Sequence, residues 1–87
     1  MKFEYDENKS VVNSQKHGID FYKAQELWLD EQIIEVELTF LDEPRWLCVG
    51  KIEGKHYTAI ITYRSDIVRI ISVRRARKNE VKNYENC

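Results

Sequence analysis

The chain contains 87 residues, 43% of them hydrophobic and 11% aromatic, a composition that predicts one packed domain over residues 1–87 and excludes a disordered chain. The formal net charge of −1 conceals an asymmetry, because residues 1–44 carry a net charge of −7 and residues 45–87 a net charge of +6. No apolar run approaches the roughly 20 residues of a membrane span, and the N-terminus lacks the apolar part of a signal peptide, so we expect a cytoplasmic protein without a membrane partner.

A short strand and two helices are predicted at the start of the chain. Residues 3–5 alternate between aromatic and polar side chains, and Asp6 then stands as the N-cap of a helix from about Glu7 to His17 that ends at Gly18. Asp20 caps a second helix in the same way. The buried face of that helix should consist of apolar residues at helical spacing: Phe21, Ala24, Leu27 and Trp28.

The remaining chain predicts a sheet followed by a helix. Four successive segments are rich in β-branched and aromatic residues: 33–40, 45–53, 56–64 and 67–75. Short turns join them, so an antiparallel meander is expected, with one face covered by the two helices. Residues 76–85 return to helical spacing and close the domain. The predicted fold class is therefore α+β.

The cysteines and histidines do not predict a metal, a cofactor or a disulfide framework. Cys48 lies in an apolar strand and is expected in the core, whereas Cys87 is expected as an exposed thiol in the tail. The two histidines have no spacing typical of a zinc site. Glycine patterns of nucleotide-binding loops and of serine hydrolases are also missing from the sequence.

The most informative segment is Val68–Tyr84, in which an apolar strand runs directly into a basic cluster: Arg74, Arg75, Arg77 and Lys78. Guanidinium groups bind phosphate through two parallel hydrogen bonds, so this cluster predicts a site for a polyanion. The alternative is a solvated basic face that the acidic half of the chain neutralises. Strand alternation predicts that Arg69, Ile71, Val73 and Arg75 lie on one side and Val68, Ile70, Ser72 and Arg74 on the other.

Two further residues have both a structural and a functional interpretation. Arg69 lies inside the apolar strand, where a charge needs a partner, so it forms either an ion pair with a helix carboxylate or a phosphate clamp. His17 ends the first helix, where the helix dipole favours its protonated form, so it is either a capping residue or a proton donor. Most carboxylates follow helix and turn edges and are expected to be solvated.

The order of motifs resembles the BrnT family of type II toxins. The resemblance covers nearly the whole chain: FEYDENK, Asn13, KHGIDF, Ala24, Arg45, Gly50, Tyr63-Arg64, and RIISVRRA followed by Glu80 and Tyr84-Glu85. Val73 stands where the family usually has alanine, which keeps an apolar side chain at this position.

The resemblance implies a small RelE-like domain that cleaves RNA without a metal and thereby inhibits translation. It also implies inhibition by a BrnA-type antitoxin with a ribbon-helix-helix domain, assembly into a hetero-oligomer, and contact with operator DNA only through that antitoxin. The acidic N-terminal half suits the antitoxin better than it suits RNA.

The mechanism expected for such an enzyme is attack by a ribose 2′-hydroxyl on the adjacent phosphate. Arg69, Arg74 and Arg75 would hold that phosphate and stabilise its developing charge, and Arg64, Arg77 and Lys78 would bind the RNA. His17 would act as base or acid, with Lys16 or Tyr84 as its counterpart.

Two alternatives belong to other classes of protein. The arginine cluster would serve a binding module if it gripped nucleic-acid phosphates, or an acidic segment of a partner, without cutting. The chain would serve as a scaffold if its main role were to form a repressor complex in which the partner reads DNA. Cleaved RNA distinguishes the enzyme from both.

Overall fold

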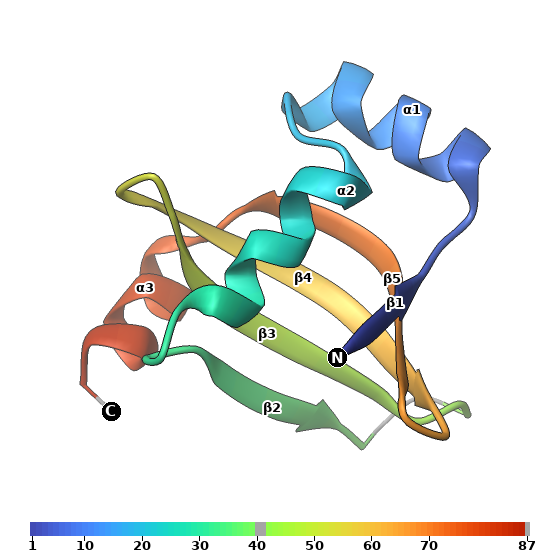
Figure 1. Cartoon of the computed structure of the whole chain (residues 1–87). Coiled ribbons are helices and arrows are strands. Elements are labelled where there is room, and N and C mark those ends of the chain that lie inside the picture. Colours follow the sequence, from blue (N-terminus) through green and yellow to red (C-terminus); the bar gives the residue numbers. More distant parts are fainter. Residues whose placement is uncertain (40–41, 87) are drawn as a thin grey trace.

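The computed structural model describes residues 1–39 and 42–86 of the chain (Figure 1). Its elements in chain order are β1 (Lys2–Glu4), α1 (Glu7–His17), α2 (Phe21–Ala24), the 3₁₀ helix η1 (Gln25–Leu29), β2 (Ile34–Leu38), β3 (Arg45–Ile52), β4 (Lys55–Arg64), β5 (Ile67–Arg75) and α3 (Lys78–Glu85). The predicted end of a strand at Phe40 and the predicted tail thiol of Cys87 lie outside the described residues.

The strands form one five-stranded sheet in the order β1-β5-β4-β3-β2. The predicted antiparallel meander is confirmed for β2 to β5. β1 adds a fifth strand, parallel to β5, with Phe3 opposite Val68, so the sheet is mixed. The α+β class is therefore confirmed, with one more sheet strand than the meander provides.

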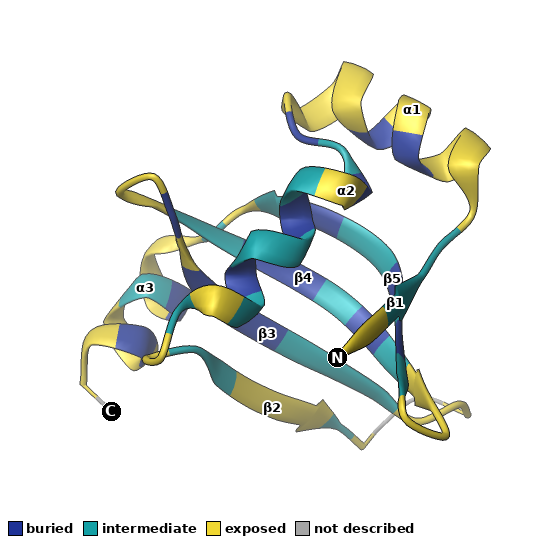
Figure 2. Cartoon of the chain, viewed as in Figure 1, coloured by how far each residue is buried: buried dark blue, intermediate teal, exposed yellow. Residues whose placement is uncertain are grey.

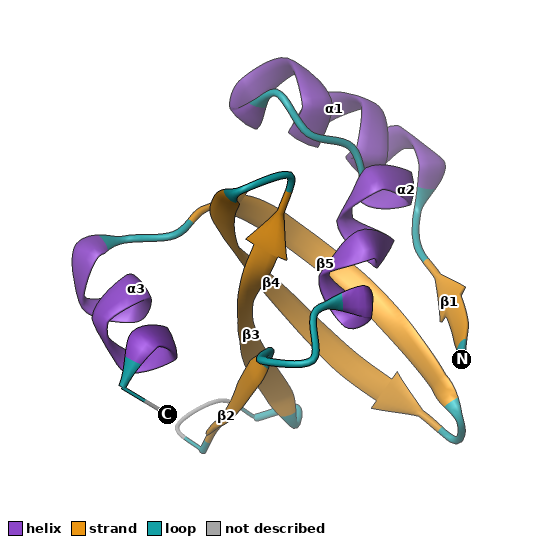
Figure 3. Ribbon diagram, turned by 60° about the vertical axis from the view of Figure 1, so that its left-hand side comes forward, coloured by secondary structure: helices purple, strands orange, loops and turns teal. Residues whose placement is uncertain are grey.

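The helices lie on both sides of this sheet, as Figure 3 shows. α2 and η1 cover one face, α3 packs against the other, and α1 lies beside β5. The core lies mainly between the sheet and α2–η1 (Figure 2), and its fully buried side chains include Phe21, Leu27, Ile61 and Ile70. No helix within residues 1–39 and 42–86 is long and apolar enough to cross a membrane.

The capping aspartates begin both N-terminal helices as predicted. The carboxylate of Asp6 accepts a hydrogen bond from the backbone N–H of Lys9, and that of Asp20 accepts one from Lys23. The second helix changes to 3₁₀ geometry after Ala24. Trp28 is therefore only partly buried and packs edge-on against Phe3, with 5.2 Å between ring centroids.

A bulge interrupts the pairing of β4 with β5. Ile60 lies opposite Ser72, whereas the next residue, Ile61, lies opposite Ile70, so Ile71 is an extra residue in β5. The side-chain alternation of β5 shifts at this point, because one residue has been inserted between its two halves.

The bulge corrects the predicted distribution of β5 side chains. Val68, Ile70 and Val73 are all buried in the core, and the register places Arg69 and Arg74 together on the opposite face. The prediction that Val73 and Arg75 share a side with Arg69 is therefore wrong, and so is the prediction that Arg74 shares a side with Val68 and Ile70. The adjacent isoleucines before Ser72 are equally apolar, so the sequence pattern contains no sign of the shift.

Candidate functional site

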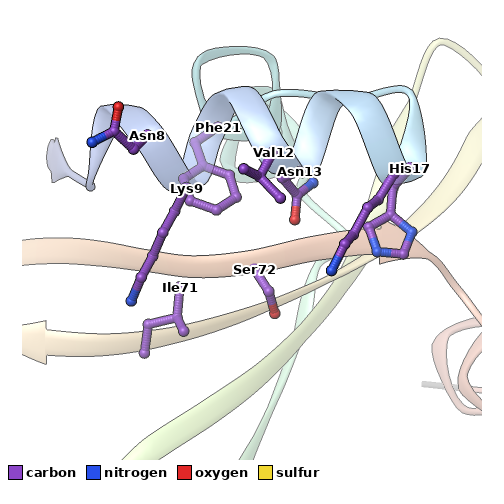
Figure 4. Close-up of a pocket in the computed structure, with 9 residues that line it drawn as sticks. Asn8, Lys9, Val12, Asn13, His17, Phe21, Ile71 and Ser72 are labelled. Atoms are coloured by element: carbon purple, nitrogen blue, oxygen red, sulfur yellow. The ribbon is translucent and has the colours of Figure 1, made fainter.

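A groove of about 360 Å³ lies between α1 and the edge of β5 (Figure 4). It forms because β1 pairs only with residues 67–69 of β5 and α1 lies beside the rest of that strand. The polar side chains that line it include Lys9, Lys16 and His17 from α1 and Ser72 from β5. The groove thus places two lysine side chains and an imidazole along one side.

Asn13 fixes α1 to the edge of β5. Its side-chain amide donates to the carbonyl oxygen of Val73 at 2.8 Å and accepts from the backbone N–H of the same residue at 3.2 Å. It also donates to the carbonyl oxygen of Ile19 at 2.9 Å. The amide therefore replaces a neighbouring strand for Val73 and sets the position of α1 along the groove.

Asn13→Ala is expected to lower the free energy of unfolding by about 2 to 4 kcal/mol, because three hydrogen bonds are lost and buried backbone groups are left without partners. Chemical denaturation of the variant measures this loss. Asn8→Ala changes the same residue type elsewhere in the groove and should cost less than 1 kcal/mol. Equal losses in the two variants would contradict the anchoring role.

Lys9 is a groove residue that the sequence reasoning missed. It lies seven residues before Lys16, so the two lysines share a helix face, and this spacing was the available signal. Neither lysine forms an ion pair within the described part of the chain. Both ammonium groups are thus available to an anion.

The groove runs toward the basic end of β5. Lys9 lies beside Ile71 and His17 lies beyond Ser72, so α1 and β5 run in the same direction (Figure 4). The next exposed cation of β5 is Arg75, whose guanidinium lies 5.6 Å from the ring centroid of Tyr57. Arg75 has no carboxylate partner among residues 1–39 and 42–86.

Arg77 and Lys78 follow this strand at the start of α3. Both side chains are exposed, and neither forms an ion pair with another described residue. The N-terminus of a helix adds positive potential to the same surface. The predicted cluster of cations at the end of the strand is therefore open to solvent, except for Arg74.

Arg74 is held by the buried carboxylate of Glu80. Two nitrogens of Arg74 bind the two carboxylate oxygens at 2.8 and 2.9 Å, and Glu80 also accepts from the hydroxyl of Thr58 and the backbone N–H of Arg77. Mainly because of Arg74, the pKa of Glu80 falls to about 2. This ion pair joins α3 to the sheet.

The guanidinium of Arg74 retains some binding capacity. One further N–H donates to the backbone oxygen of Arg75 at 3.2 Å. An arginine has five N–H donors, so the Nε–H and one Nη2–H have no acceptor among the described residues. Glu80 therefore orients Arg74 without using all of its donors.

Arg69 forms an ion pair at the other end of β5. Its guanidinium lies 2.6 Å from a carboxylate oxygen of Glu4, and Arg64 lies 3.8 Å from the same oxygen. The ion pair was one of the two interpretations of Arg69, but the prediction that its partner lies on a helix is wrong. The partner comes from β1, because its parallel pairing places Glu4 directly opposite Arg69.

Tyr84 lies near the end of α3, and its hydroxyl donates to Asp30 at 2.6 Å. Asp30 also accepts from the backbone N–H groups of Gln32 and Lys51. Burial and the bond to this carboxylate raise the pKa of Tyr84 to about 12. Burial alone would raise the pKa of Asp30, but the hydrogen bonds that it accepts lower this pKa below its usual value.

Tyr84→Phe is expected to lower the free energy of unfolding by about 1.5 to 3 kcal/mol, because it removes a hydrogen bond to a charged group. RNA cleavage per folded molecule should be unchanged if the hydroxyl only positions α3. Thermal unfolding and a cleavage assay on the same preparation measure both quantities. Loss of cleavage at full stability would instead give the hydroxyl a direct role.

Cys48 is buried in the core as predicted. Burial raises the pKa of its thiol, which leaves the thiolate scarce at neutral pH. Within the described residues, no group of three His, Cys, Asp or Glu side chains is arranged as a metal site.

The structure thus separates the predicted site residues into three groups. Lys16 and His17 lie in the groove, which runs toward a surface formed by Arg74, Arg75, Arg77 and Lys78. Arg64 and Arg69 gather around Glu4 at the opposite end of β5. Tyr84 belongs to α3, and this helix lies away from α1 in both Figure 1 and Figure 3.

The chain is thus a small α+β domain in which cations and a histidine line one groove. A family model described as ribonuclease toxin, BrnT, of type II toxin-antitoxin system matches residues 5–80. The chain therefore belongs to the BrnT family of ribonuclease toxins, and its system includes an antitoxin. No curated protein matches the chain significantly.

Proposed function

We propose that residues 1–87 act as one RelE-like domain, a metal-independent endoribonuclease in the cytoplasm that inhibits translation by cleaving RNA. The observation that carries this proposal is the groove beside the basic end of β5, in which Lys9, Lys16 and His17 have no carboxylate partner among residues 1–39 and 42–86. A polyanion with a reactive proton is the ligand that such a groove fits best.

Binding follows from the arrangement of the cations. The RNA backbone crosses the surface of Arg75, Arg77 and Lys78, enters the groove at its His17 end and continues toward Lys9. Arg74, oriented by Glu80, directs its two remaining donors at the scissile phosphate. Arg64 and Arg69 lie beside Glu4 at the opposite end of β5 and would bind RNA that extends beyond the groove.

Cleavage uses the 2′-hydroxyl of the RNA itself. His17 accepts the proton of this hydroxyl. The 2′-oxygen then forms a bond to phosphorus, and the bond between phosphorus and the 5′-oxygen breaks. Lys16 supplies the proton to the leaving 5′-oxygen, so the products are a 2′,3′-cyclic phosphate and a 5′-hydroxyl. Arg75 and Arg74 stabilise the extra negative charge of the transition state. Tyr84 positions α3 and takes no part in the proton transfer.

The experiment is cleavage of a labelled RNA by the purified chain in the presence of EDTA, with end-group analysis of the products. Wild type should give cyclic phosphate ends, and His17→Ala should cleave at least about a hundredfold more slowly. Lys82→Ala, on the exposed part of α3, is the matched control and should retain full activity. Loss of wild-type activity in EDTA would overturn metal independence.

We further propose that the antitoxin is of the BrnA type, with a ribbon-helix-helix domain, and that the two chains form a hetero-oligomer that contacts operator DNA through the antitoxin alone. The support is the family to which the chain belongs. A DNA-binding assay with each chain separately and with the mixture tests this arrangement. Binding of operator DNA by the toxin alone would contradict it.

The ion pairs of Arg69 and Arg74 favour one alternative, a binding module that does not cut RNA. Both guanidinium groups already contact a carboxylate, which lowers the positive charge available for transition-state stabilisation. A folded chain that shifts RNA in a gel without producing fragments would support this alternative.

A further inference from the structure

β2 forms the outer edge of the sheet, on the side opposite β1. It pairs with β3 through the whole of Ile34–Leu38, and no strand of the described chain lies on its other side. Its outward backbone N–H and C=O groups therefore resemble those of any open sheet edge, which accepts a further strand.

One side of this edge strand is apolar. Ile34, Val36 and Leu38 point to the sheet face on which α3 lies, and the side chain of Val36 is 47% exposed. Across the sheet, Val36 lies opposite Leu47, and Leu47 lies opposite Ile60. Both partners are half-buried, so an apolar row continues inward from the edge.

The other side of the edge strand is acidic. Glu35 and Glu37 alternate with the apolar residues, and both are exposed. Residues 24–44 contain no lysine or arginine, whereas their acidic side chains number seven: Glu26, Asp30, Glu31, Glu35, Glu37, Asp42 and Glu43. The edge thus carries a strong negative charge next to its apolar row.

The charge decides between the possible occupants. Pairing of two copies along β2 would place Glu35 and Glu37 of one chain beside those of the other, and like charges in neighbouring strands are destabilising. RNA is repelled for the same reason. An extended basic segment of another protein has the complementary charge.

We propose that the edge of β2 binds an extended segment of the antitoxin, in which apolar residues alternate with Lys or Arg. The segment adds a sixth strand, its apolar side chains continue the row that begins at Val36, and its cations face Glu35 and Glu37. This inference deepens the proposed function, because it assigns to the antitoxin a surface distinct from the RNA groove.

The test uses the protein encoded by the reading frame adjacent to that of the toxin as the antitoxin probe. Hydrogen exchange of the complex should show protection of the amides of Ile34–Leu38. Val36→Lys combined with Glu37→Lys should weaken the complex by about tenfold or more. Val11→Lys combined with Glu85→Lys makes the same charge change at exposed positions of α1 and α3 and should leave affinity unchanged.

The outcomes separate this inference from the proposed function. A complex that forms without protection of β2, or that both double variants weaken equally, overturns the edge site and leaves the antitoxin and the nuclease in place. Failure of the adjacent product to bind overturns both the edge site and the proposed partner. Cleavage of RNA by the free Val36→Lys, Glu37→Lys variant should equal that of wild type, because β2 does not line the groove.

Discussion

Glu80→Ala is expected to lower the free energy of unfolding by about 3 to 5 kcal/mol, the range found when one partner of a buried ion pair is removed. The Glu80 residue is 7% exposed, and its carboxylate binds Arg74, Thr58 and the backbone of Arg77. The substitution leaves the charge of Arg74 without its partner and detaches α3 from the sheet. Urea denaturation at neutral pH measures the loss.

The pH dependence provides a second readout of the same ion pair. The ordinary pKa of 4.5 for Glu80 falls to about 2 in the folded protein, so its stabilisation is fully present above about pH 4.5 and is lost as the pH falls toward 2. From 1.36 kcal/mol per pKa unit, this loss is on the order of 3 kcal/mol. Glu80→Gln should flatten the acid limb of the stability curve. An unchanged acid limb in this variant would contradict the role of the ion pair.

Arg75→Ala is expected to slow RNA cleavage by at least about a hundredfold, because it removes a cation that stabilises charge on the scissile phosphate. Its effect on the free energy of unfolding should stay within about 0.5 kcal/mol, since the side chain is exposed and its only described contact of note is with the ring of Tyr57. Single-turnover cleavage and thermal unfolding measure the two effects.

Arg74→Ala is the informative comparison for this variant. It should lower both stability and cleavage, because the same guanidinium holds Glu80. Arg75 therefore gives a cleaner test of the phosphate site than Arg74 does. If Arg75→Ala cleaves RNA at the wild-type rate, the end of β5 does not contact the scissile phosphate.

Local signals in the sequence were sufficient for most elements of the fold. Asp6 and Asp20 cap helices because their short side chains reach the first free N–H groups, and this requirement is local. The strands of the meander follow one another along the chain, so turn residues such as Gly54 determine their pairing.

The features that could not be predicted depend on contacts between distant residues. The pairing of β1 with β5 joins residues more than 60 positions apart, and the ion pair of Glu4 with Arg69 follows from it. The bulge at Ile71 is hidden because Ile70 and Ile71 are equally apolar and either could face the core. Asn13 also belongs to this group, because its role requires the exposed edge of β5 beside α1.

The candidate site was predictable in its chemistry but not in its grouping. The cations of residues 74–78 and the pair Lys16-His17 were evident from the sequence. The sequence did not reveal which cations lack a carboxylate partner, because the carboxylates that bind Arg69 and Arg74 come from β1 and α3. The groove could only be defined once α1 had been placed beside β5.

The most direct measurement is growth and total-RNA integrity after pulsed expression of the wild-type chain and of a Lys16→Ala, His17→Ala double variant, with the folding of both checked by circular dichroism. The proposed nuclease predicts growth arrest with fragmented RNA for the wild type, and normal growth with intact RNA for the folded variant. A folded wild-type chain that leaves RNA intact, or a double variant that still fragments RNA, would contradict a ribonuclease site in the groove between α1 and β5.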